Sequence, residues 1–281
     1  MKLQYLGTAA AEGFPSLYCV CDTCRRAWEA GGKNIRSRSQ SVIDNKLLID
    51  FPPDTYMHML AHRLPLEKIT NCIITHDHSD HFYVWDLENR GDEYAKIIEG
   101  QQFNLYGTKV VYEKTVDFFG SLEAAQKYHV TPHLLERFTP VQIGEYLVTP
   151  LPATHDPKSD PVIYLIEDKT ASLLYAHDTG IIADDVFAYL VSHGKKLDFV
   201  SLDCTAGMLT GSRLCHLGLD TCIEMRDKMI ETGITKADTR FCLNHFSHNC
   251  RATYDEMLVP ANQAGFEVSY DGMCVDFYSD K

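Results

Sequence analysis

One short segment of the sequence limits the possible folds more than any other feature, because it gathers five metal-binding side chains within six positions. It reads HDHSDH over residues 76–81 and directly follows an apolar run that we predict to be a strand. Side chains two apart on an extended chain face the same side, so His76 and His78 can bind one cation. Asp80 and His81, just past the strand, can reach a second one. Imidazole and carboxylate suit Zn²⁺, Mn²⁺ or iron, so the fold must bring further ligands to this histidine segment.

Three further candidate ligands each stand where a predicted strand ends, namely His155, Asp178 and His245. Functional groups often lie where a buried strand meets a loop, so we expect these side chains to converge on the histidine segment. His177, beside the aspartate, is expected to point to the opposite face of its strand. Asp50 also follows a predicted strand, and we interpret it either as a turn former or as a partner that orients a metal-bound histidine.

A second cluster of metal-binding side chains lies near the start of the sequence, at Cys19, Cys21 and Cys24. We expect the ten cysteines of this chain to be reduced, and three thiols cannot all pair with one another. Three thiolates and one imidazole form a closed tetrahedral zinc site. His248 is the candidate for the fourth ligand, with Cys250 as the alternative. Exposed free thiols would oxidise readily, which favours a structural zinc ion here.

Strand-like and helix-like segments alternate along the whole sequence, without an internal repeat, a low-complexity stretch or a linker. This alternation predicts one layered α/β domain over residues 1–281. Several strands are apolar throughout, as in sheets that are buried on both faces. The predicted strands cover residues 2–8, 41–51, 71–75, 103–107, 145–153, 161–167, 171–176, 198–203, 240–244 and 266–277. The predicted helices cover residues 54–63, 108–119, 181–193, 216–232 and 251–264.

At these positions the sequence resembles the metallo-β-lactamase fold superfamily of metallohydrolases. The resemblance covers nearly the whole chain, from Leu3 through the histidine segment to the last strand-end ligand. It implies a four-layer αβ/βα sandwich with a dinuclear active site. It also implies that Asp178 bridges the two ions, and true β-lactamases usually lack such an aspartate. The implied ligands are His76, His78 and His155 for one divalent ion, and Asp80, His81 and His245 for the other.

The cysteine cluster, which follows the sequence GTAAAEGFP, resembles that of the phosphoribosyl cyclic phosphodiesterases of the carbon–phosphorus lyase pathway. Those proteins carry a structural zinc ion there, completed by a histidine just beyond the last active-site ligand, as His248 lies beyond His245. The resemblance implies hydrolysis of a small cyclic ribose phosphodiester by a hydroxide that bridges two divalent ions, Mn²⁺ or Zn²⁺. The resemblance implies that Asp80, Asp178 and His216 are catalytic, with His216 as the proton donor. Two alternatives remain open. His216 has a purely local role, or His248 is the acid.

Two other functions are compatible with the same ligands. The cysteine cluster also occurs in a pyrroloquinoline-quinone biosynthesis protein of this fold. A thioester hydrolase of the glyoxalase II type shares the dinuclear ligands but not the cysteine cluster. A processing ribonuclease is disfavoured by the charge of the chain, because nucleic-acid binding needs a basic surface.

The charge and hydropathy of the chain also limit its partners. There are 26 basic and 39 acidic residues, a net charge of −13, which argues against nucleic acid or an anionic membrane as the main partner. No apolar run approaches the ~18 residues that span a bilayer, and no signal-peptide pattern is present, so we expect a cytoplasmic protein. The expected partner is a small anionic phosphodiester. The sequence leaves the oligomeric state open, with a homodimer as one candidate.

Overall fold

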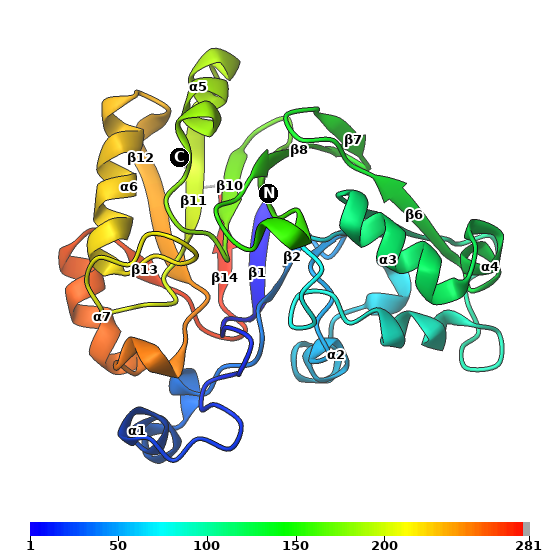
Figure 1. The fold of residues 1–281 in the computed structure, drawn as a ribbon, viewed down its shortest axis with the longest axis horizontal. Coiled ribbons are helices and arrows are strands. Elements are labelled where there is room, and N and C mark those ends of the chain that lie inside the picture. Colours follow the sequence, from blue (N-terminus) through cyan, green and yellow to red (C-terminus); the bar gives the residue numbers. More distant parts are fainter. Residues whose placement is uncertain (278–281) are drawn as a thin grey trace.

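Two seven-stranded β-sheets form the centre of the protein in the computed structural model, which describes residues 1–277 (Figure 1). The first sheet contains, in spatial order, β14 (Cys274–Asp276), β1 (Lys2–Gly7), β2 (Gln40–Ile43), β3 (Leu47–Ile49), β4 (Asn71–Ile73), β5 (Phe103–Gly107) and β6 (Val130–Leu134). The second contains β13 (Glu267–Val268), β12 (Thr235–Asn244), β11 (Leu197–Asp203), β10 (Ser172–Ala176), β9 (Val162–Glu167), β8 (Tyr146–Pro152) and β7 (Val141–Ile143).

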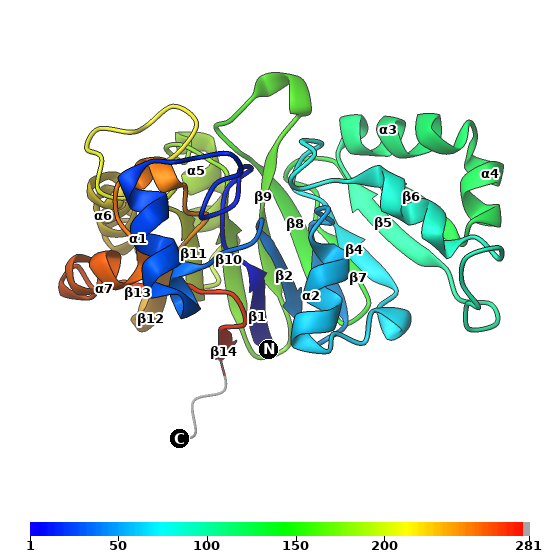
Figure 2. The same ribbon diagram turned by 90° about the horizontal axis from the view of Figure 1, so that it is seen from below.

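Helices cover the outer faces of the two sheets. Figures 1 and 2 show α5, α6 and α7 beside the second sheet, and α2, α3 and α4 beside the first. The helices are α1 (Asp22–Ala30), α2 (Thr55–His62), α3 (Lys109–Phe119), α4 (Leu122–Lys127), α5 (Asp184–His193), α6 (Leu219–Glu231) and α7 (Tyr254–Gln263). Short 3₁₀ helices are η1 (Gly32–Asn34), η2 (Leu66–Lys68), η3 (Val84–Arg90), η4 (Pro157–Ser159) and η5 (His248–Cys250).

Apolar side chains fill three layers of contact. Leu3 and Tyr164 belong to the cluster between the two sheets. Val111 of α3 packs in the cluster outside the first sheet, and Met225 of α6 in the cluster outside the second. Strands with apolar contacts on both faces have no polar face, which explains their continuous apolar runs. The predicted α/β fold with four layers is therefore confirmed.

The structure differs from the sequence prediction in several places. Residues 266–277, predicted as one strand, form β13 in the second sheet and β14 in the first, and the helix α1 and the strand β7 were not predicted. Residues 118–140, expected to be loop, contain α4 and β6. Pro132 interrupts the apolar pattern of β6, and it is tolerated because β6 is an edge strand. The helix expected from His216 begins at Leu219, so the histidine lies in the preceding loop. None of the helices within residues 1–277 is long and apolar enough to cross a membrane.

The direction of the strands places the candidate ligands together. β3 runs parallel to β4 in the first sheet, and β10, β11 and β12 are parallel in the second. β8 is antiparallel to β9, which is antiparallel to β10, so β8 shares the direction of β10. The candidate ligands follow the carboxyl ends of these strands, and these ends meet at one edge of the sandwich.

Candidate metal centre

Four side chains from three strand ends form a first donor set. His76 and His78 follow β4, His155 follows β8 and Asp178 follows β10, and one ligand atom from each lies within 4.8 Å of the others. His76 Nε2 is 3.1 Å from Asp178 Oδ2 and 3.0 Å from His78 Nδ1. His155 Nε2 is 3.4 Å from the same carboxylate oxygen. The structure therefore brings these four predicted ligands together around one point.

A second donor set lies beside the first and shares one of its members. Asp80, His81 and His245 join Asp178, again with ligand atoms within 4.8 Å of one another. His81 Nε2 is 3.2 Å from Asp80 Oδ2, 3.2 Å from His245 Nε2 and 3.3 Å from Asp178 Oδ2. The grouping is the one that the family resemblance implies, and Asp178 Oδ2 faces both sets.

Three residues of this region adopt a left-handed backbone conformation. The φ angles are 66° at Asp50, 52° at Asp178 and 63° at His245, each shortly after the end of β3, β10 or β12. Residues with a Cβ rarely adopt such angles, and where they do, the surrounding structure must enforce them. Here the turn stops the extended course of each strand, so that the side chain reaches the sheet edge.

The two donor sets have unsatisfied groups that a cation would satisfy. Asp178 Oδ1 is buried and makes no hydrogen bond among the described residues, although His216 Nδ1 lies 3.2 Å away. Nitrogen atoms of His81 and His245 face each other, and both rings are almost completely buried. Buried polar groups without partners are costly, and a metal ion among imidazoles and carboxylates removes that cost. The residues therefore fit divalent metal ions.

The charge states of the donors also suit metal binding. Burial lowers the pKa of His76, and it lowers the pKa of His155 to about 4, so both imidazoles are neutral near pH 7. Burial alone would raise the pKa of Asp178. The surrounding imidazoles, with His245 foremost, outweigh that effect and hold the pKa of this carboxyl well below its usual range. His76, His155 and Asp178 are thus in the forms that zinc and manganese bind. For His81, the charges of Asp80 and Asp50 outweigh burial and raise the pKa well above its usual range, so a bound cation would displace a proton from this ring.

Asp50 holds the histidine segment in place. Its Oδ1 accepts a hydrogen bond from Thr75 N at 2.8 Å, and its Oδ2 lies 2.8 Å from His81 Nδ1. The carboxylate is completely buried. A partner on Nδ1 fixes the ring and leaves Nε2 directed at the second donor set. Of the two interpretations of Asp50, the structure thus supports the orienting partner.

Asp203, at the end of β11, supports the other side of the centre, and the sequence analysis did not identify it. It accepts hydrogen bonds from Thr205 N, Thr205 Oγ1, Leu217 N and Asp178 N, at 2.9 to 3.1 Å. Thr205 Oγ1 lies 2.8 Å from His245 Nδ1. Because these hydrogen bonds engage both oxygens of the carboxylate, we interpret Asp203 as a residue that positions the ligands Asp178 and His245. Its signal was the same as for Asp178, an aspartate at the end of a buried strand.

His216 lies on an open cavity of about 360 Å³ beside both donor sets. Its Nδ1 is 3.2 Å from Asp178 Oδ1 and 3.4 Å from Asp203 Oδ2. Burial alone would lower the pKa of His216, but the hydrogen bond and charge of Asp203 outweigh burial and raise it to about 9. An imidazole that is protonated near pH 7 and lies on a cavity can supply a proton.

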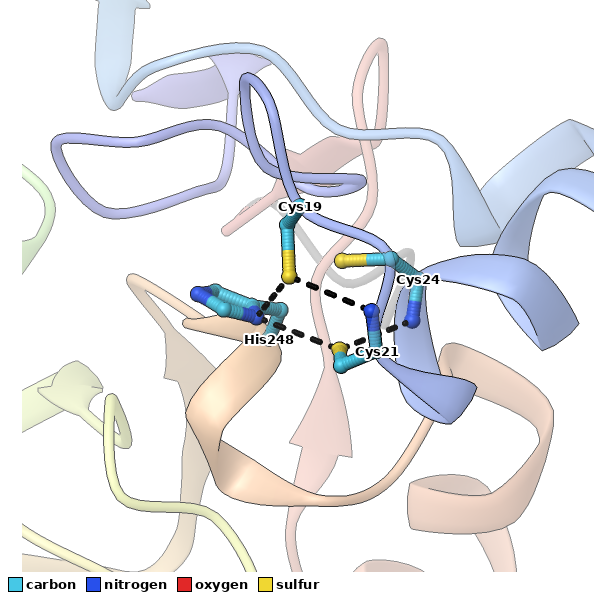
Figure 3. Close-up of side chains that lie close together, drawn as sticks. All are labelled: Cys19, Cys21, Cys24 and His248. Atoms are coloured by element: carbon cyan, nitrogen blue, oxygen red, sulfur yellow. Dashed lines mark hydrogen bonds between the residues drawn. The ribbon is translucent and has the colours of Figure 1, made fainter.

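The cysteine cluster forms a separate donor set (Figure 3). Cys19 Sγ and Cys21 Sγ each lie 3.4 Å from His248 Nδ1, and Cys24 completes the group. Cys21 is the N-cap of α1, where its sulfur accepts a hydrogen bond from the amide of Cys24. Burial raises the pKa of Cys24 to about 12. For Cys21, hydrogen bonds from His248 and a backbone amide outweigh burial and lower the pKa to about 6.

Two other residues considered in the sequence lie outside these donor sets. Cys250 is buried in the core outside the second sheet, where its Sγ donates to Ala252 O at 3.0 Å. The structure therefore places His248, and not Cys250, with the three cysteines. His177 contacts Ser201 Oγ at 2.6 Å and Asn244 Nδ2 at 3.0 Å, so it belongs to a buried network away from the cavity.

Two sheets between helices, with histidines and aspartates gathered at one edge, define a metallohydrolase fold of the metallo-β-lactamase type. The chain belongs to this superfamily, because the family described as "Beta-lactamase superfamily domain" matches residues 45–245.

Comparison with known proteins gives two more specific likenesses. Coenzyme PQQ synthesis protein B of a Methylorubrum extorquens strain is 30% identical over 154 residues, which cover 50% of this chain and 49% of that protein. In this match the chain spans about half the length of its curated relative. A diphosphatase of the PhnP family has a TM-score of 0.71 at 21% identity, over 98% of this chain and 96% of that one. Zn²⁺-bound PqqB from Methylobacterium extorquens has a TM-score of 0.72 at 20% identity, over 98% and 100%. Both structures share the fold.

Proposed function

We propose that the protein is a dinuclear metal-dependent phosphodiesterase that hydrolyses a small phosphodiester, with a cyclic ribose phosphate as the leading candidate. The observation that carries this proposal is that two donor sets share Asp178 Oδ2 and adjoin a cavity with His216 on its wall. The diphosphatase of the PhnP family supports chemistry at phosphorus, since it has the same fold. In this proposal the donor sets hold two Mn²⁺ or Zn²⁺ ions, and the cysteine cluster holds one structural zinc.

The metal ions would activate a water molecule and withdraw charge from the phosphoryl oxygens. The residues of the chain supply the geometry for this. Asp178 sets the spacing between the two donor sets, and Asp80 adds a second negative charge beside it. His81 is oriented by Asp50, and His245 is oriented by Thr205. Because these supports are buried, the donor atoms are held in position before a substrate binds.

In this proposal His216 gives a proton to the leaving oxygen. Its Nδ1 faces Asp178 and Asp203, so its Nε2 is the atom available to the substrate. The two carboxylates stabilise the protonated ring. The side chain is 31% exposed, so solvent can return the proton after each turnover.

A comparison of three substrates tests the proposed function. Purified protein loaded with Mn²⁺ is offered a chromogenic phosphodiester, a cyclic ribose phosphate and a glutathione thioester. We expect hydrolysis of both phosphodiesters, and loss of that activity after chelation. Hydrolysis of the thioester alone would instead establish a thioesterase of the glyoxalase II type and overturn the proposal.

A role in pyrroloquinoline-quinone biosynthesis is the second candidate, because the curated relatives carry that name. It can be tested by expressing this chain in a methylotroph that lacks its own coenzyme PQQ synthesis protein B. Restored production of the quinone would favour this candidate. Phosphodiesterase activity in vitro without restored production would favour the main proposal.

A further inference from the structure

A third donor set lies beside the two that form the metal centre. Asp203 and His216 join Asp178 and His245, with one ligand atom from each within 4.8 Å of the others. His216 Nδ1 is 3.2 Å from Asp178 Oδ1 and 3.4 Å from Asp203 Oδ2. Donor atoms that surround a tetrahedral zinc ion lie about 3.3 Å apart, so both distances suit such an ion. His245 Nδ1 already contacts Thr205 Oγ1 at 2.8 Å, and we therefore consider the other three members as ligands.

One atom of the third donor set lacks a hydrogen bond. Within residues 1–277 the buried Asp178 Oδ1 has no hydrogen-bond partner, and this side chain is only 4% exposed. The other oxygen, Oδ2, faces both donor sets of the metal centre. Oδ1 thus stays available when that centre is filled, and it faces the imidazole of His216. A buried carboxylate oxygen without a partner is costly, and a further cation would remove that cost.

The cavity connects the third donor set with solvent. Asp178 and His216 both line it, and the side chain of His216 is 31% exposed. Asp203 is completely buried and fixed, since its Oδ2 accepts hydrogen bonds from Thr205 Oγ1 and Asp178 N. Carboxylates that bind metal ions are commonly held by such hydrogen bonds. An ion can therefore enter from the cavity, and water there can complete its coordination.

We propose that the third donor set is an inhibitory site for a further zinc ion, bound by His216, Asp178 and Asp203. The inference rests on the proposed function, in which His216 gives a proton to the leaving oxygen. An ion that binds Nδ1 displaces the proton there, so the ring keeps one proton, on Nε2. Donation of that last proton would leave an anionic ring, which is far less favourable than donation by an imidazolium. The further ion thus removes the proton donor and leaves the metal centre occupied.

Zinc should bind this inhibitory site more weakly than it binds the metal centre. The site shares Asp178 with that centre, so a further dication is repelled by two others nearby. Inhibition should therefore require zinc in excess of what the metal centre and the cysteine cluster bind. Sites of imidazole and carboxylate hold zinc more tightly than manganese, so Mn²⁺ at the same concentration should inhibit much less.

A zinc titration with two esters tests the proposal. Protein whose metal centre and cysteine cluster are filled with zinc receives further zinc chloride. We expect one additional ion to bind in titration calorimetry, with an additional peak beside His216 in anomalous diffraction at the zinc edge. As this ion binds, turnover of an ester with an alcohol leaving group should fall by about tenfold or more. Turnover of a nitrophenyl ester should fall much less, because nitrophenol leaves without a proton.

Variants separate this site from other zinc binding. His216→Ala should lose the additional ion and keep the others. His193→Gln is the matched control, because it removes a histidine that lies 3.0 Å from Glu167, outside the cavity, and it should keep the additional ion.

Three results would contradict the inference. If His216→Ala still binds the additional ion, or if the wild type binds none, the inhibitory site does not exist and the phosphodiesterase stands. Equal inhibition with both esters would show that the ion does not act on proton donation. No turnover of either ester at any zinc concentration would overturn the proposed function and the inhibition, whereas the peak beside His216 would still establish the binding site.

Discussion

The two metal-binding regions of this molecule are built in opposite ways. The ligands of the histidine and aspartate centre come from several strand ends, spread from His76 to His245, and most of them are buried. The cysteine cluster takes three of its four ligands from one stretch of six residues at the start of α1, and two of those, Cys19 and Cys21, are partly exposed. One centre therefore depends on the whole sandwich, whereas the other mainly ties a loop to the segment around His248.

This difference suggests different tasks. The buried centre is supported by further buried groups, Asp50 and Asp203, which orient its ligands and give it a fixed geometry for chemistry. The cysteine cluster is closed by four ligands, which is typical of structural zinc. Substitution of a ligand in the histidine and aspartate centre should therefore reduce turnover, and substitution of a ligand in the cysteine cluster should reduce the stability of the fold.

The largest effect is expected for Asp178→Asn, because Asp178 faces both donor sets. We expect turnover to fall by more than about 10⁴-fold, as when one member of an interdependent catalytic unit is lost. The bound divalent metal should also decrease, which mass spectrometry of the native protein measures. Asp77→Asn is the matched control, because Asp77 lies in the histidine segment but faces Lys114. Near-normal turnover by Asp178→Asn would contradict a shared ligand.

His216→Ala should reduce kcat by about 10²–10⁴-fold, the usual range for general acid catalysis, with the metal content intact. The loss should be smaller for a nitrophenol leaving group, which needs no proton, than for an alcohol. Equal losses on both esters would mean that His216 does not supply the proton.

Asp203→Asn should have an intermediate effect, about 10–100-fold, because Asp203 acts through His216 and the loop that orients His245. Asp198→Asn, at the other end of β11, serves as the control. Metal affinity and kcat are the two measurements. If Asp203→Asn behaves like Asp198→Asn, this carboxylate does not support the centre.

Cys19→Ser tests the role of the cysteine cluster. We expect loss of one tightly bound zinc ion and a decrease in Tm on the order of 5 °C, while turnover of the chromogenic phosphodiester stays within about threefold. The exposed Cys274 offers the control, Cys274→Ser. A loss of turnover as large as that of His216→Ala would remove the proposed distinction between the regions.

The smallest expected effect is a change of stability with pH, caused by a buried histidine that is linked through Gln40 to Asp50. His58 is buried, contacts Gln40 Oε1 at 2.6 Å, and Gln40 in turn donates to Asp50 O. Burial lowers the pKa of His58 to about 4, below the value near 6.5 in the unfolded chain. Its contribution to stability is therefore present above pH 6.5 and is lost as the pH falls from 6.5 through 4. Between pH 7 and 5.5 the free energy of unfolding should fall by about 1 kcal/mol, and His58→Gln should remove this slope in urea titrations.

Much of the fold and of the candidate centre could be predicted because the sequence repeats one signal. A polar residue after an apolar strand marks His155, Asp178 and His245, and strand direction then brings them together. The same signal was present at Asp203. Without the contacts of the folded chain, however, an aspartate that binds metal and one that supports a ligand look alike.

Other features could not be read from local patterns. β6 was missed because Pro132 interrupts its pattern, and only its edge position makes the proline acceptable. The choice between His248 and Cys250 depended on how η5 turns, since both residues lie in that short helix. Thr205 contacts His245 across 40 positions of sequence, and threonines carry no signal for such a role.

The most direct test of the central claim is anomalous X-ray diffraction from crystals of the Mn²⁺-loaded protein, recorded at the manganese and zinc absorption edges. Our account predicts two manganese peaks on either side of Asp178, each surrounded by one donor set, and one zinc peak among Cys19, Cys21, Cys24 and His248. A single peak, or none, between the histidine segment and His245 would contradict a dinuclear centre.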